Sequence, residues 1–260
     1  MRFFFRYVIP ATYFESTRIP TVALKIYNGL VEWLPALVFS LYFNEYSTKV
    51  IVTVILSYVA FICVYEIGYL TNDYYSELFE DEPRGRGAAL ADQGPAVHAL
   101  ITVRIIIFLC CTFLLGVSDS VLWWTFHGTL AATFALHNLL PNEMRIGTFF
   151  GLSAYRFLGP MIVTLRPEVL SVLVPAAFLN HSLYRTTVYL RGKNTNNKTA
   201  NASVTPKFGF YAGCLPFSAL LSYFYGSFIP LGLCLYFGFV WILYLAASTL
   251  TGWKPGPGSQ

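Results

Sequence analysis

Long apolar runs separated by short polar segments dominate the chain from residue 22 onward. A helix needs about 20 apolar residues to cross a hydrocarbon layer about 30 Å thick, and eight runs come close to that length. They lie at residues 22–43, 49–71, 96–116, 120–139, 147–165, 169–190, 208–225 and 227–248. The pattern predicts an all-α fold, a polytopic membrane helical bundle of about eight transmembrane helices.

These runs leave no room for a separate soluble domain, so we expect one membrane domain over residues 1–260. It comprises an N-terminal segment (1–20), the transmembrane bundle (22–248) and a flexible tail (249–260). Composition agrees, because 56% of the residues are hydrophobic and 12% are charged, against about 25% charged in soluble domains. The five cysteines lie in apolar runs without a C-x-x-C spacing, so we expect small buried hydrophobes.

Lysine and arginine are distributed unevenly between alternate loops. The N-terminal segment, the second, fourth and sixth loops and the C-terminal tail hold twelve, and the opposite loops hold Lys49 and Arg166. The positive-inside rule therefore places both termini on the cytoplasmic face. The net charge of +4 is explained by this bias and needs no nucleic-acid partner.

Three further cations, Lys25, Arg104 and Arg156, fall inside predicted helices. An ionisable residue within the membrane is expensive, so a functional role is the first interpretation. The alternative for Lys25 and Arg156 is a structural pair with Glu66 or Glu32, and Arg104 is equally open to pairing with an acidic neighbour.

An acidic stretch follows the second apolar run. If that helix continues past the membrane edge, Asp73, Glu77 and Glu80 fall within about 60° of one another, and Glu66 lies on the same face. Pro83 is then expected to end the helix. Like charges this close repel beside a low dielectric unless a cation is present.

Clustered carboxylate oxygens suit Mg²⁺, which binds through one or two carboxylates and substrate phosphates. Arg84 and Arg86 follow directly and are expected to contact the same phosphate oxygens. The stretch thus predicts a metal that holds a diphosphate at the mouth of an apolar central cavity. The alternative is a solvated acidic loop at the membrane edge.

The stretch NDYYSELFE, from Asn72 to Glu80, resembles the first signature, N-D-x-x-D-x-x-x-D, of the UbiA superfamily of intramembrane prenyltransferases. Asn72 and Asp73 match, Ser76 stands at the next ligand position with Glu77 beside it, and Glu80 replaces an aspartate. Arg18 with Pro20, the loop residues His137 and Arg145, and the helical Arg156 also resemble the family in order. The resemblance covers roughly residues 12–225.

Two features depart from the family pattern. The second aspartate-rich motif is missing, because no acidic residue follows Glu168, and eight predicted helices stand against the family's nine. The basic residues of the sixth loop, with Arg191 and Lys193 among them, either bind phosphate directly or act as positive-inside anchors. They and Lys25 also resemble a subgroup that transfers phosphoribose to polyprenyl phosphate.

The resemblance implies a Mg²⁺-dependent transferase that moves a prenyl group from a prenyl diphosphate to a lipophilic acceptor in the bilayer. The expected catalytic residues are Asn72, Asp73, Glu77 and Glu80, the last three as metal ligands. The expected diphosphate contacts are Lys25, Arg84, Arg86, Arg145, Arg156, Arg191 and Lys193. Phosphoribosyl transfer, terpene cyclisation and a non-catalytic binding or scaffold role remain alternatives.

Overall fold

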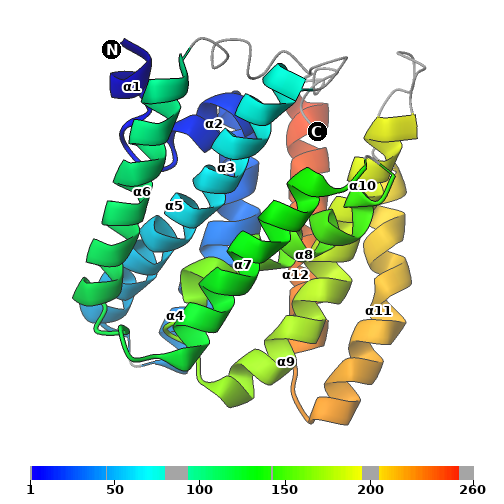
Figure 1. Cartoon of the computed structure of the whole chain (residues 1–260). Coiled ribbons are helices and arrows are strands. Elements are labelled where there is room, and N and C mark those ends of the chain that lie inside the picture. The colour runs from blue at the N-terminus through cyan, green and yellow to red at the C-terminus, as the bar shows by residue number, and fades with distance from the viewer. Residues whose placement is uncertain (1, 45, 80–92, 142, 195–204, 252–260) are drawn as a thin grey trace. The chain divides into compact units, whose positions relative to one another are not determined.

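The structure is a computed structural model that describes residues 2–44, 46–79, 93–141, 143–194 and 205–251 (Figure 1). Within these ranges the fold is all-helical, and no strand occurs. A helix lies in each of the eight apolar segments that the sequence singles out. The helices form two compact units that are interleaved along the chain.

Unit 1 is built around a long central helix. It spans Met1–Lys25, Leu37–Leu140 and Gly159–Thr164. Its helices, some shared at their ends with unit 2, are α1 (Arg2–Tyr7), α2 (Thr12–Arg18), the start of α3 (Val22–Asn28), most of α4 (Leu34–Phe43), α5 (Thr48–Phe79), α6 (Gly94–Leu114), α7 (Val121–Leu139) and the 3₁₀ turn η3 (Gly159–Met161). The helix α5 packs most extensively on α6, and also on α7 and η3 (Figure 1).

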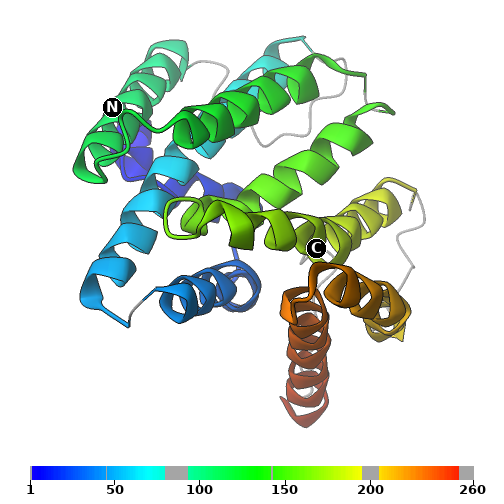
Figure 2. The ribbon, with the colours of Figure 1, turned by 90° about the horizontal axis from the view of Figure 1, so that it is seen from below.

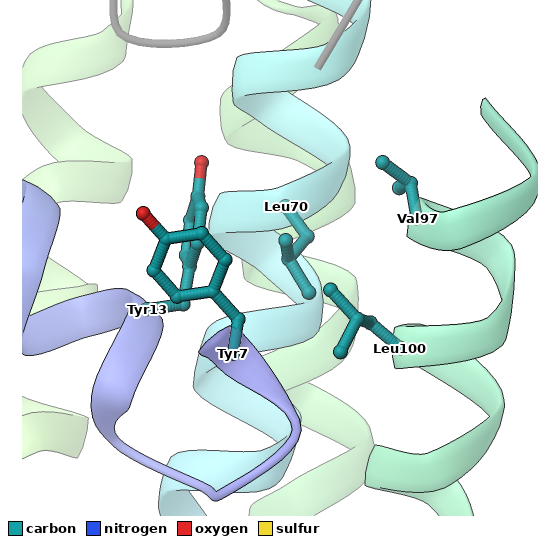
Figure 3. Packing of buried hydrophobic residues seen from close by; sticks show 5 residues of the cluster. All are labelled: Tyr7, Tyr13, Leu70, Val97 and Leu100. Atoms are coloured by element: carbon teal, nitrogen blue, oxygen red, sulfur yellow. The ribbon is translucent and has the colours of Figure 1, made fainter. Parts of the chain in front are cut away.

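One core cluster of unit 1 joins the N-terminal segment to α5 and α6. Leu70 of α5 faces Val97 and Leu100 of α6, and the rings of Tyr7 and Tyr13 lie beside them (Figure 3). The two tyrosine rings meet edge to face with centroids 5.3 Å apart. This packing fixes α1 and α2 against α5, and it determines which N-terminal side chains reach that helix.

Two glycines allow close helix contacts in unit 1. A Cβ atom at Gly68 of α5 would lie 2.3 Å from the ring of Phe134 in α7. One at Gly159 would lie 2.4 Å from the ring of Phe61 in α5. Both positions therefore depend on the missing side chain.

Unit 2 consists of Ile26–Ala36, Pro141–Leu158 and Leu165–Gln260. Its helices are the π-helix η1 (Gly29–Trp33), α8 (Arg145–Leu158), α9 (Pro167–Ala177), the π-helix η4 (Phe178–Ser182), α10 (Leu183–Asn194), α11 (Thr205–Tyr225) and α12 (Ile229–Thr251). The helices α11 and α12 lie side by side in both ribbon views (Figures 1 and 2), and α12 also packs on α9.

Four helices of the described chain are long and apolar enough to cross a membrane, judged by length and composition. They are Val22–Phe43, Thr48–Tyr75, Gly94–Leu114 and Ile229–Ala246. These apolar helices indicate a membrane protein. They account for four of the roughly eight spans that the sequence predicts. The predicted span at 147–165 is interrupted: α8 ends at Leu158, where Gly159 and Pro160 follow, because proline cannot continue the ladder of helical hydrogen bonds.

The second predicted helix does continue beyond the apolar run. The helix α5 has 32 residues, about 48 Å at 1.5 Å per residue. It therefore carries Asp73 and the backbone of Glu77 in one continuous helix, as the sequence predicts.

Candidate functional site

Asp73 lies near the C-terminal end of α5 and is buried, with 4% of its surface exposed. Arg18 of α2 donates from Nη2 to both carboxylate oxygens, at 2.7 Å and 2.9 Å. The hydroxyl of Tyr13 donates to Oδ2 at 2.7 Å. The two α2 residues stand five positions apart, so they reach the carboxylate from neighbouring turns of one short helix.

This contact determines the protonation states of the N-terminal residues. Burial and the nearby Asp73 carboxylate raise the pKa of Tyr13 well above its ordinary value. Burial alone would lower the pKa of Arg18, but Asp73 outweighs that effect and the pKa rises. Arg18 therefore stays a cation and Tyr13 a neutral donor at physiological pH.

An aromatic ring faces the Arg18 side chain, and further rings pack against that ring. Its Cζ atom lies 4.2 Å from the ring centroid of Tyr69, which is a cation–π distance. Tyr69 stacks on Phe14 and meets Phe134 edge to face. Arg18 Nη1 is buried and has no hydrogen-bond partner in the described ranges, so one donor of this guanidinium is available to a ligand.

Glu66 lies seven residues before Asp73, on the buried face of α5, as the sequence predicts. Its carboxylate accepts from Arg104 Nε at 2.7 Å and from the backbone N–H of Phe14 at 2.8 Å. The other nitrogens of Arg104 donate to the backbone carbonyls of Tyr7, Val8 and Ile9. Glu66 and Arg104 thus anchor the N-terminal segment, and the pairing alternative for Arg104 is the one observed.

The remaining residues of the acidic stretch are seen only in part. Asn72 Nδ2 donates to Asp73 Oδ1 at 3.3 Å, as an orienting partner would. The side chain of Glu77, and Glu80, Arg84 and Arg86 altogether, lie outside the described residues. No group of three His, Cys, Asp or Glu side chains that could hold a metal occurs in the part searched.

Magnesium can be tested against Asp73 itself. Its carboxylate oxygens are the hard ligands that Mg²⁺ prefers, so the donor chemistry fits. Both oxygens already accept hydrogen bonds, and Arg18 supplies the compensating positive charge. A metal ion at Asp73 would therefore compete with Arg18 for the same oxygens.

The other predicted phosphate contacts belong to several different helices. Lys25 is half exposed and pairs with Glu15 at 2.5 Å. Arg145 begins α8, and Arg156 lies within that helix in unit 2. Arg191 and Lys193 belong to α10, with side chains outside the described part.

Arg156 instead contacts residues of unit 2. Its Nε donates to Glu32 Oε2 at 2.8 Å, and its Nη2 donates to Asn28 Oδ1. The alternative of a pair between Arg156 and Glu32 is thus the arrangement observed.

The sequence did not single out Tyr13 or the contact between Arg18 and Asp73, although Arg18 stood in a stretch that resembles the family.

No protein-family model, no curated protein and no solved structure matches this chain.

Proposed function

We propose that the chain is a UbiA-like intramembrane transferase, which moves a prenyl group from a Mg²⁺-bound prenyl diphosphate to a lipophilic acceptor. The contact between Arg18 and Asp73 carries this proposal. It brings together STRIP and NDYYSELFE, the two stretches whose residues resemble family signatures. Residues 55 positions apart have no local reason to meet, so the contact supports a shared site.

The N-terminal residues bind and orient the head of the donor in this proposal. Arg18 donates from its unpartnered Nη1 to a phosphate oxygen, and Arg84 and Arg86 supply further contacts. Asp73, Glu77 and Glu80 would hold Mg²⁺, and the ion would take the place of Arg18 at the Asp73 oxygens. When bound, the metal neutralises charge that builds on the leaving diphosphate.

The aromatic residues beside Arg18 serve the reacting carbon. The allylic C–O bond breaks and its electron pair leaves with the diphosphate. The acceptor carbon then forms the new bond and loses its proton to the released diphosphate. The Tyr69 face already holds a guanidinium at 4.2 Å, so the same kind of face suits an allylic cation. Phe14 and Phe134 add apolar surface that excludes water.

The finer topology belongs to the same proposal. About eight spans enclose a central cavity for the prenyl tail, both termini face the cytoplasm, and the diphosphate enters from that side. The distribution of lysine and arginine over the loops supports this orientation.

A non-catalytic binding or scaffold role is the second candidate. The observation that favours it is the complete engagement of Asp73, whose two oxygens already accept bonds from Arg18 and Tyr13. In that case the acidic residue fixes α2 to α5, and no metal replaces the guanidinium.

Donor binding separates the two candidates. Purified protein in detergent is titrated with farnesyl and geranylgeranyl diphosphate, with Mg²⁺ and with EDTA. A transferase binds at least one donor with Mg²⁺, and Asp73→Asn removes that binding. Asp119→Asn, the same change at an exposed loop carboxylate, keeps it.

Products then distinguish the enzymatic alternatives. Diphosphate release that needs an aromatic acceptor identifies prenyl transfer, and release without an acceptor identifies a cyclase. Diphosphate release from phosphoribosyl diphosphate in the presence of polyprenyl phosphate identifies phosphoribosyl transfer. If wild type binds no diphosphate under any condition, or if Asp73→Asn binds as well as wild type, the proposed site is wrong. Circular dichroism and the melting temperature show whether each variant is folded.

A further inference from the structure

A second group of charged side chains lies inside unit 2, and we call Glu32, Arg156, His181 and Arg185 the Glu32 cluster. Arg156 Nε donates to Glu32 Oε2 at 2.8 Å. Around the other oxygen, Oε1, lie Arg185 Nη1 at 3.7 Å and His181 Nε2 at 3.9 Å. Glu32, Arg156 and His181 are at least 95% buried, while the Arg185 side chain is 25% exposed.

Both Glu32 and His181 lie in π-helical turns, η1 and η4. Prolines account for the irregular turns: Pro175 lies three residues before η4, and Pro35 follows η1. A proline lacks the N–H group that an α-helix needs at that point. Single π turns interrupt α-helices frequently at functional sites, and here they bring Glu32 and His181 within 3.9 Å.

Several buried polar atoms of this region lack hydrogen-bond partners in the described ranges. They are Glu32 Oε1, both ring nitrogens of His181, and the hydroxyls of Ser153 and Ser182. The His181 ring interacts with the Ser153 backbone, so Glu32 Oε1 and the two serine hydroxyls are the atoms that most clearly need a partner. Buried polar groups are normally paired, so these atoms indicate a polar occupant.

The charge of the cluster defines the occupant further. Two guanidinium groups face a single carboxylate, since the other acids of unit 2, Glu143 and Glu168, are exposed. With a neutral imidazole the cluster carries one positive charge in excess of its single carboxylate, and Arg185 holds that charge at the partly exposed edge of the cluster. An anion would neutralise the excess positive charge. If that anion also has an O–H group, it can donate a hydrogen bond to Glu32 Oε1.

We propose that the Glu32 cluster binds a phosphate group that keeps one proton. The phosphate O–H donates to Glu32 Oε1, and other oxygens accept from Arg185 and Ser182. The separations of 3.7 Å and 3.9 Å exceed ordinary hydrogen-bond distances, so neither Arg185 nor His181 satisfies Glu32 Oε1 directly. The inference concerns unit 2 alone, and it stands whether or not the chain transfers prenyl groups.

Sulfate tests the role of the proton, because it has the shape of phosphate but carries no proton near pH 6. The full-length protein in phosphate-free detergent buffer at pH 6 is titrated with inorganic phosphate and with sulfate. A phosphate monoester has its second pKa at about 6, so lysophosphatidic acid serves as the lipid headgroup. Competition between lysophosphatidic acid and inorganic phosphate shows which source binds more tightly.

Two variants are expected to change phosphate binding, and one control variant is expected to leave it unchanged. Wild type binds phosphate at least about tenfold more tightly than sulfate, and Glu32→Gln loses this preference because the amide also donates. Arg185→Gln weakens phosphate binding about tenfold by removing one charge. Arg166→Gln, at an exposed arginine of the same unit, leaves phosphate binding unchanged.

Absence of phosphate binding to folded wild-type protein overturns the inference, and so does equal affinity for phosphate and sulfate. Binding that Arg185→Gln and Arg166→Gln weaken equally also overturns it, because a general charge effect then suffices. Arg185 is partly exposed, so its variant is expected to fold. The thermal transition of each variant is recorded without ligand, and only folded variants are compared.

Discussion

The carboxylate of Glu66 and the guanidinium of Arg104 are both completely buried, and their Oε2 and Nε atoms lie 2.7 Å apart. The arginine also donates to three backbone carbonyls of the N-terminal segment. The ion pair joins α5 to α6, and the same arginine also holds the N-terminal segment in place.

Breaking this pair from one side is expected to be costly. Arg104→Met leaves Glu66 buried without its charged partner, and we expect a loss of about 3–5 kcal/mol in the free energy of unfolding. The double variant Glu66→Leu with Arg104→Met should lose clearly less than the sum of the two single variants. Reversible denaturation in detergent measures all four proteins, and additive losses would contradict the coupling.

Alkaline pH should weaken the contact of Tyr13 with Asp73. The pKa of Tyr13 is raised above the ordinary 10.0, so the folded state holds the phenolic proton more tightly than the unfolded state. The contribution is complete below pH 10 and declines as the pH rises further. Tyr13→Phe removes this group, so the stability gap between wild type and variant should shrink between pH 8 and pH 11. A gap that widens would show that the sign is wrong.

Gly68 is expected to tolerate no side chain. The Cβ of alanine would lie 2.3 Å from the ring of Phe134, and such overpacking costs about 1–3 kcal/mol. Gly128→Ala, in α7 with nothing within 4 Å of its Cβ, should instead be neutral or stabilising by up to about 1 kcal/mol. Melting temperatures compare the two variants, and Phe134→Leu should rescue Gly68→Ala if the ring is the obstacle.

The orientation in the membrane can be tested at two loops. In a background without cysteine, Glu143→Cys should react with an impermeant maleimide only from the cytoplasmic side, and Asp119→Cys only from the opposite side. Both positions are exposed, so reactivity reports the side of the membrane. Labelling of both from one side would refute the orientation that the positive charges predict.

Local features of the fold follow from the sequence. The length of α5 and the shared buried face of Glu66 and Asp73 depend only on apolar run length and helical period, which act within a few turns. The rule that buried charges are paired also correctly offered Glu32 as a partner for Arg156.

The partners themselves could not be read from periodicity. Arg18 and Asp73 are 55 residues apart, and Arg156 and Glu32 are 124 apart, so tertiary packing decides these contacts. The π turns are a second reason, because one extra residue per turn rotates Glu32 and His181 away from the α-helical pattern. Prolines near both turns were the only available signal.

The reach of Arg104 back to Val8, 96 positions earlier, has a consequence for the order of assembly. The ribosome releases Val8 long before it releases Arg104. These residues cannot settle until α6 has been made and has joined α5. The segment around Val8 therefore reaches its final conformation only after α5 and α6 have packed together.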